Sequence, residues 1–192
     1  MSRESSKGRR RPTPTVIGLP DPHLNPGAAP LPVTIFSEAK GPGRDEEAWM
    51  SWSKDEVFAF LSEEPRLGRL ATVTPAGEPH VVPIWFGVVG DELRIHTQAE
   101  STKAANIAAT GRFAMAVDVA EMPYKGVSLR GTAEAVGEDV IDPYALAREL
   151  AVAYLGEEAG APFGDAIANA PGVHVTLVLR PREWEAWDYS RG

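Results

Sequence analysis

The sequence contains no cysteine, and this absence removes several classes of site at once. Disulfides, thiolate metal sites and cysteine nucleophiles are all excluded. No stretch approaches the roughly 18 consecutive apolar residues that a membrane-spanning helix needs. The basic run near the start, from Arg3 to Arg11, is not followed by the apolar segment that a signal peptide carries. We therefore expect a cytoplasmic protein.

Positive charge is also scarce. The 192 residues carry a formal net charge of −8, whereas partners such as nucleic acids and anionic membranes attract basic surfaces. Hydrophobic residues make up 43% of the chain, which is enough for a sizeable core. The composition therefore predicts one folded domain with no nucleic-acid partner and no membrane partner.

Residues 1–45 differ in composition from the rest of the chain. After the basic run they are rich in proline and glycine, with prolines spread from Pro12 to Pro42. Proline at that density prevents helix formation and favours an extended chain. We interpret residues 1–45 as a flexible arm, in which the apolar stretch 31–36 is the piece able to dock, and residues 46–192 as the folded domain.

The hydrophobic periodicity of the folded domain predicts mostly strands. Helices are expected after a capping box at Ser53-Glu56, at 102–109 after a cap at Ser101, and from Pro143 to about Gly156. The Gly/Ala-rich segment 156–172 is expected to be a loop. Strands are expected at 67–73, 79–89, 93–97, 112–119, 127–136 and 173–179, with a last one after Pro181. Strands linked by hairpins favour an antiparallel barrel over alternating βαβ units.

The segment from Thr97 to Asn106 joins a predicted strand to a predicted helix through hydroxyl residues and a lysine. The first backbone N–H groups of a helix have no intrahelical partner, and the helix dipole favours an anion beside them. Ser101 and Thr102 add hydroxyl donors and Lys103 adds a positive charge, so the set suits a phosphate. The alternative is an ordinary helix cap beside a solvent-facing lysine, because serine and threonine caps are common.

The earlier segment Pro79–Phe86 is apolar on both faces and contains two prolines. Proline cannot donate to a strand ladder, so this segment is predicted to be an edge or bulged strand with unpaired backbone groups. Those groups, together with the side chains of Pro83, Ile84 and Trp85, suit a flat heteroaromatic ring. A core strand at a dimer interface is the alternative.

Other polar residues on the predicted strands are weaker candidates for a functional site. The histidines are scattered, and a zinc site built from His80, His96 and His174 is an alternative to structural roles, which are commoner for single strand histidines. We therefore predict no metal. Arg130 stands at a non-core position beside Gly131, where a ligand can approach the backbone closely, or else it is a solvated strand arginine.

Taken together, these segments resemble the pyridoxamine 5′-phosphate oxidase-like superfamily of split β-barrels. The resemblance runs from about Trp52 to Trp187 and leaves out the arm; the matching stretches are 68–73, 77–86 and 101–107, followed at fitting spacing by 112–115 and 130–134. It implies a mainly β fold with a few helices, an antiparallel split β-barrel of the FMN-binding type over residues 46–192, assembled as a homodimer.

Within the superfamily the chain looks most like the flavin/deazaflavin oxidoreductases, particularly those that bind coenzyme F420. The resemblance implies a cofactor in clefts between two subunits, with its phosphate against 101–103 and its ring against 81–85. The cofactor-binding residues implied by position are Val82, Pro83, Ile84, Trp85, Thr97, Ser101, Thr102, Lys103 and Asn106. The acidic tail of F420 needs further cations, for which Arg69, Arg94 and Lys125 are available.

The implied activity is hydride transfer between F420 and a small organic substrate. FMN is the alternative cofactor, and a non-catalytic carrier of flavin, F420 or haem is the alternative class of protein. Residues 181–188 lack the arginine/histidine motif that binds substrate in the pyridoxamine phosphate oxidases proper, so that activity is not expected. No acid/base pair stands out, and Arg130 and His80 are the candidates for a proton source.

Overall fold

Ser53 caps the first helix of the part of the chain that this computed structural model describes, residues 52–191. Helix α1 (Lys54–Glu63) begins with the predicted capping box, in which the Ser53 N–H donates to Glu56 Oε2 at 2.8 Å and the Glu56 N–H donates to Ser53 Oγ at 3.3 Å. Its buried face carries Val57, Phe60 and Leu61. The predicted arm, residues 1–45, lies outside the described residues.

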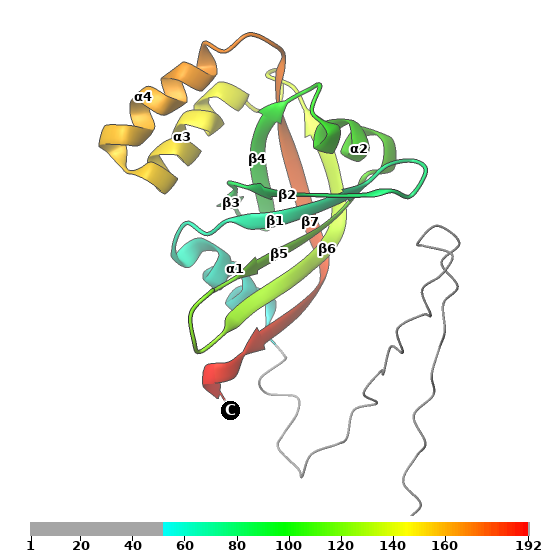
Figure 1. Ribbon diagram of the computed structural model, residues 1–192, viewed down its shortest axis with the longest axis vertical. Helices are drawn as coiled ribbons and strands as arrows, with labels where there is room; N and C mark the ends of the chain where they lie inside the picture. The colour runs from blue at the N-terminus through cyan, green and yellow to red at the C-terminus, as the bar shows by residue number, and fades with distance from the viewer. Residues whose placement is uncertain (1–51, 192) are drawn as a thin grey trace, which may run out of the picture. The chain divides into compact units, whose positions relative to one another are not determined.

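Seven strands form one curled antiparallel sheet (Figure 1). Their spatial order is β2-β1-β5-β6-β7-β4-β3, so β2 and β3 are the two edges. The strands are β1 (Gly68–Val73), β2 (Pro79–Ile84), β3 (Gly87–Val89), β4 (Glu92–Gln98), β5 (Arg112–Asp118), β6 (Lys125–Val136) and β7 (His174–Asp188). The predicted split β-barrel is confirmed, and the proline-bearing strand is an edge strand as its sequence indicates.

The core lies on the concave side of this sheet and follows the period-two pattern of the strands. On β4 the side chains of Leu93, Ile95 and Thr97 are buried, while the residues between them face the other side. Leu70 of β1 and Leu129 of β6 belong to the same apolar cluster. Because one face of each strand is buried, a shift of register by one residue would expose the whole set.

The predicted strand 79–89 is interrupted, which corrects the sequence-based expectation. β2 ends at Ile84 and β3 begins at Gly87. Between them, the Tyr154 hydroxyl accepts a hydrogen bond from the Phe86 N–H at 3.2 Å and lies 3.3 Å from the Phe86 carbonyl. A side chain from a distant helix therefore contacts the backbone groups that a strand ladder would otherwise pair.

The last strand is longer than the sequence-based expectation. Two strands were expected on either side of Pro181, but β7 runs unbroken from His174 to Asp188. A register shift at Arg130/Gly131 of β6 stands opposite the proline. A Cβ at Gly131 would overlap the Arg180 carbonyl, so this glycine allows β6 to approach the bulge closely.

Residues 157–168 form a helix, so the loop predicted for 156–172 is wrong over most of its length. Helix α4 (Glu157–Ala168) lies beside α3 (Pro143–Leu155) in a helical hairpin (Figure 1). A Cβ at Gly160 would overlap the Ala151 carbonyl, and one at Gly164 would lie 2.6 Å from the Arg148 Cα. The glycines that suggest a loop are therefore the surface on which the two helices meet. Within the described range no helix is both long and apolar enough to cross a membrane.

Candidate functional site

Helix α2 (Thr102–Thr110) starts directly after β4 and is capped as predicted. Ser101 Oγ accepts a hydrogen bond from the Ala104 N–H at 3.4 Å and lies 3.1 Å from Thr97 Oγ1. Gly111 ends the helix with a φ of 65°, in the left-handed region that favours glycine. The Ser101–Thr97 contact joins the start of α2 to the end of β4. Lys103 therefore lies in the first turn of the helix.

Lys103 is a partly buried cation with no ion pair in residues 52–191, and burial lowers its pKa. Most of the other described lysines and arginines pair with a carboxylate. The exceptions are Lys125, which lies 5.2 Å from the centre of the Trp52 ring, and the exposed Arg112 and Arg182. A partly buried positive charge without a counter-charge, at the positive end of a helix, suits an anionic ligand.

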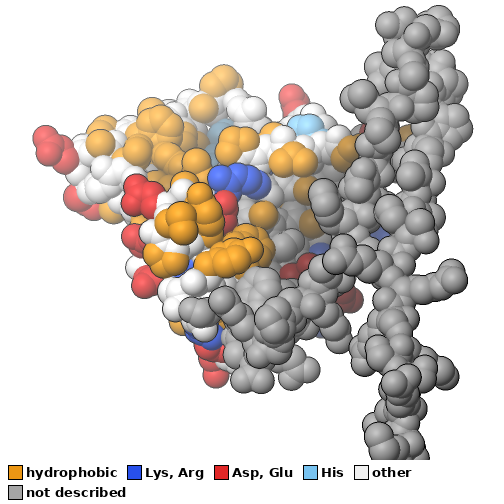
Figure 2. Space-filling model, turned by 60° about the horizontal axis from the view of Figure 1, so that its bottom comes forward, with side chains coloured by type: hydrophobic (Ala, Val, Ile, Leu, Met, Phe, Trp, Pro, Cys, Tyr) orange, Lys and Arg blue, Asp and Glu red, His pale blue; other side chains and the backbone are white. Residues whose placement is uncertain are grey.

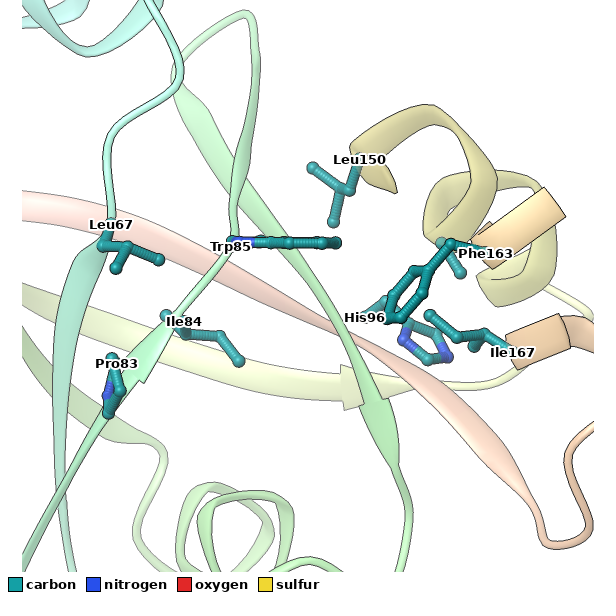
Figure 3. Close-up of a pocket in the computed structure, with 9 residues that line it drawn as sticks. Leu67, Pro83, Ile84, Trp85, His96, Leu150, Phe163 and Ile167 are labelled. Carbon is teal, nitrogen blue, oxygen red and sulfur yellow. The ribbon is translucent and has the colours of Figure 1, made fainter. Parts of the chain in front are cut away.

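A cavity of about 370 Å³ lies between the end of β2, strand β4 and the α3–α4 hairpin (Figure 3). Such a volume is typical of small-molecule sites. Its wall is almost entirely apolar and consists of Leu67, Pro83, Ile84, Trp85, His96, Ala147, Leu150, Phe163 and Ile167. The face of the molecule in Figure 2 carries patches of hydrophobic side chains, one of them over the hairpin.

Trp85 forms the central wall of this cavity. Its ring stacks on Tyr154 with centroids 5.0 Å apart and an interplanar angle of 18°, and it meets the Phe163 ring at 57°. The Tyr154 hydroxyl donates to the Arg66 carbonyl at 2.7 Å. Figure 3 shows Trp85 projecting from the segment after β2 toward Leu150 and Phe163. The aromatic wall is held in place by contacts with both the barrel and the hairpin.

His96 reaches the same cavity from β4. Its Nε2 lies 2.8 Å from Nδ1 of His174, the first residue of β7, and the two rings stack. Burial, followed by the nearby His174 and Lys103, lowers the pKa of His96 to about 4. His96 is therefore neutral at physiological pH. Lys103 does not line the cavity, but its charge acts on the imidazole of His96, which does.

The structure brings only part of the predicted cofactor-binding set to the cavity. Pro83, Ile84 and Trp85 line it, whereas Thr97, Ser101 and Lys103 lie outside its lining, at the junction of β4 and α2. The inward-facing Val82 packs against the core, and Thr102 is exposed at the first position of α2. Asn106 is buried, and its Nδ2 donates to Thr72 Oγ1 at 3.0 Å, so its amide bonds within the barrel.

The candidates for a proton source lie elsewhere. Arg130 is exposed on β6 and pairs with Glu183 at 2.7 Å and with Glu185 at 3.5 Å. His80 stands opposite Thr72 on β2, and its Nδ1 is buried without a hydrogen bond in the described residues. Neither lines the cavity. His80 also does not join His96 and His174 in a group of three that could hold a metal, and residues 52–191 contain no other such group.

The three basic residues that the sequence offers for the acidic tail of F420 already contact other groups of the protein. Arg69 pairs with Asp118, and Arg94 lies 3.7 Å from Glu92. Lys125 lies over the Trp52 and Phe60 rings beside α1.

Sequence reasoning missed two parts of the site. One is the wall that α3 and α4 supply through Leu150, Phe163 and Ile167. The other is the contact between His96 and His174. Strand alternation does place His96 on the face opposite the core, which is a usable signal, but its partner depends on the pairing of β4 with β7.

Comparisons with known proteins agree with this architecture. A conserved hypothetical protein from Mycobacterium tuberculosis is 28% identical, with a TM-score of 0.58, over 74% of this chain and 89% of that one. A protein named F420 reductase is 30% identical, with a TM-score of 0.52, over 66% of this chain and 94% of that one.

A more distant likeness extends to a haem-related protein. The FAD- and haem-binding protein of Mycobacterium smegmatis is 23% identical, with a TM-score of 0.52, over 73% of each chain, and at that identity the likeness shows the fold alone. Among curated protein sequences no relative matches.

The family model for pyridoxamine 5′-phosphate oxidase matches residues 53–188, which span every strand of the sheet and the four α-helices of the described part of the chain. The capped α2 after β4, the edge strand with its two prolines and the curled seven-stranded sheet all lie inside that match. This chain belongs to the pyridoxamine 5′-phosphate oxidase family.

Proposed function

We propose that this protein is an oxidoreductase that binds coenzyme F420 and moves a hydride to or from a small organic substrate. The observation that carries the proposal is Lys103, a partly buried cation without an ion pair in residues 52–191, whose charge acts on His96 in the wall of an apolar cavity. A ligand with a flat ring and a phosphate attached through a short chain matches that combination. The 30% identity to a protein named F420 reductase favours the deazaflavin over FMN.

The chain's own residues would bind and orient the cofactor. Lys103 and the first N–H groups of α2 would hold the phosphate, with Ser101 fixing the start of the helix. Backbone groups along the edge strand, near Pro83 and Ile84, would meet the polar edge of the ring, while the apolar wall excludes water. Once bound, the deazaflavin supplies the hydride chemistry.

The first test is a titration of the full chain with F420 and, separately, with FMN, followed by fluorescence. We expect F420 to bind more tightly. The variant Lys103→Met should weaken F420 binding about ten- to hundredfold, the range for a lost charge-assisted hydrogen bond. Arg112→Met is the matched control, because Arg112 is equally unpaired among the described residues but exposed, and it should bind F420 like the wild type.

The titration also separates the alternatives. If FMN binds more tightly than F420, FMN replaces F420 as the cofactor in the proposal. A Soret band after addition of haem, with no affinity for either flavin, would favour the carrier class. Equal F420 affinities for wild type and Lys103→Met would remove the phosphate cradle from the proposal.

We further propose that the protein is a homodimer. The side of β2 that faces away from the core carries Val81, which is 61% exposed, together with Pro83. On the adjacent strands, Val73 of β1 and Ala114 of β5 are exposed as well. An apolar surface that spans neighbouring strands is typical of a subunit interface.

Light scattering at micromolar protein should give a mass of twice 20.6 kDa. The variant Val81→Glu should shift the mass toward 20.6 kDa, because it places a charge in the proposed interface. A wild-type mass of 20.6 kDa would contradict the dimer.

A further inference from the structure

The cavity beneath the α3–α4 hairpin has one polar side chain in its wall. Eight of its nine lining residues are apolar, and the ninth is His96. No carboxylate and no guanidinium lines it. In Figure 3 the His96 ring lies close to Phe163 and Ile167, with Trp85 and Leu150 across the cavity. A ligand that enters this space therefore meets apolar surface on nearly every side.

The hydrogen bond between the two histidines decides what His96 can offer such a ligand. His174 Nε2 is buried and has no hydrogen-bond partner in residues 52–191. An orphaned buried N–H is rarer than an under-used acceptor, so we assign the proton of His174 to Nδ1, which donates to His96 Nε2. His96 then carries its own proton on Nδ1.

That Nδ1–H has no hydrogen-bond partner in residues 52–191 and is not among the fully buried unpaired atoms. It is a donor that a ligand can reach. His96 also remains neutral, because burial holds its pKa near 4. A neutral donor in an apolar wall pairs with a neutral acceptor, whereas burial of a charged group in the same wall is costly.

The shape of the wall favours a flat molecule. The Trp85 ring is fixed by stacking on Tyr154, and the Phe163 ring stands at 57° to it, so two aromatic surfaces bound the space. Flat rings stack well on such surfaces. A volume of about 370 Å³ accommodates a compound of two or three fused rings.

We propose that this cavity binds a neutral, flat ring compound with one hydrogen-bond acceptor, such as a carbonyl oxygen, which accepts from Nδ1–H of His96. His174 is a positioning residue that orients the His96 ring. Binding to the cofactor-free protein stands by itself; the role of the ligand as the substrate rests on the proposed function and requires that the cofactor ring lie along the edge strand and leave this cavity free. The phosphorylated, charged substrate that gives the family its name does not suit this wall.

The test uses the full chain without cofactor at neutral pH and three compounds of matched shape: acetylnaphthalene, ethylnaphthalene and naphthoate. Calorimetry should show acetylnaphthalene binding about three- to tenfold more tightly than ethylnaphthalene, the net value of one hydrogen bond. Naphthoate is tested on Lys103→Met, which removes the proposed anion site, and should show no detectable binding. In His96→Phe, which keeps a ring but removes the donor, the two neutral compounds should bind equally.

A second variant keeps the proposal testable if His96→Phe does not fold. Phe163 is 47% exposed, so Phe163→Glu should fold and should abolish binding of both neutral compounds by placing a charge in the wall. Leu155→Glu is its control, because Leu155 is 43% exposed on the same hairpin and lies outside the cavity lining.

Equal wild-type affinities for the ketone and the hydrocarbon, or tight binding of naphthoate by Lys103→Met, would overturn the cavity assignment. A protein that binds the ketone through His96 but binds neither F420 nor FMN would overturn the proposed function and leave the cavity assignment standing. The two failures are therefore distinguishable.

Discussion

Two lysines, Lys103 at the start of α2 and Lys125 at the start of β6, are partly buried and lack an ion pair in residues 52–191, yet their surroundings differ. Lys125 lies 5.2 Å from the centres of both the Trp52 and the Phe60 rings, and its charge lowers the pKa of Asp188. Lys103 has no carboxylate partner in the described residues, and its charge lowers the pKa of His96, which is also basic. One cation is stabilised within the protein and the other is not.

We interpret the difference as one between a structural end of the barrel and the proposed cofactor-binding end. Around Lys125 the aromatic rings and a buried carboxylate satisfy the charge, although this lysine also lines a second cavity of about 410 Å³ beside α1. Around Lys103 burial disfavours the charge and no described group compensates for it. A protein retains such an uncompensated cation at a cost, and an anionic ligand is the physical explanation that we favour.

The largest expected effect is a loss of stability on acidification, and it comes from His96, which lies on the Lys103 side. The native pKa of His96 is about 4, against 6.5 in the unfolded chain, so the unfolded chain binds more protons between these values. Stability should therefore fall as the pH falls from about 6.5 to about 4, by about 1–3 kcal/mol once partial exposure of the ring is considered. Urea unfolding at several pH values measures it.

His96→Phe is the control and should remove most of that slope. On the Lys125 side, burial raises the pKa of Asp188, but the Ser190 hydrogen bonds and the charges of Lys125 and Arg191 outweigh it, and the net pKa is lowered from 3.8. Its contribution is lost only at pH values below that number. If the wild type were equally stable at all pH values between about 6.5 and about 4, the contrast between the two ends of the barrel would be wrong.

Lys125→Met should give the next largest effect. It removes a cation from the two rings and leaves Asp188 with less compensation, which should lower the free energy of unfolding by about 1–2 kcal/mol. Chemical denaturation at neutral pH measures this change, and the affinity for F420 should remain at the wild-type value. A loss of cofactor affinity without a loss of stability would reverse the roles assigned to the two ends.

Lys103→Met should give the smallest effect on stability, with the opposite sign. Removal of a partly buried charge that burial disfavours should leave the ligand-free protein unchanged or more stable by up to about 1 kcal/mol. The same denaturation series detects it, with the exposed Arg112→Met as reference. Destabilisation by as much as Lys125→Met would show that Lys103 is also a structural cation.

Much of the barrel could be predicted because its strands have one buried face. Leu93, Ile95 and Thr97 alternate with polar residues, and this local pattern is sufficient to place β4 and its hairpin with β3. The cap at Ser101 and the stop at Gly111 are equally local, because both depend on hydrogen bonds within one helical turn. The position of Lys103 in the first turn of α2 follows from the same residues.

What could not be predicted depends on contacts between distant segments. Gly160 and Gly164 belong to a helix only because α3 offers a surface close enough for them, and by themselves they resemble loop residues. The cavity wall could not be predicted either, since Phe163 and Ile167 lie on the same helix. The break after Ile84 likewise requires the Tyr154 hydroxyl, which comes from a residue 68 positions away from Phe86.

The Tyr154 hydroxyl contacts the backbone of two other segments, Phe86 at the break between β2 and β3 and Arg66 before β1. Any movement of α3 away from the barrel must therefore release the Phe86 amide to solvent. That single amide should act as a reporter of hairpin opening, with a hydrogen-exchange rate that rises when the hairpin lifts and falls when a ligand fills the cavity beneath it. The opening of the hairpin and the protection of one backbone proton are thus linked through one phenol.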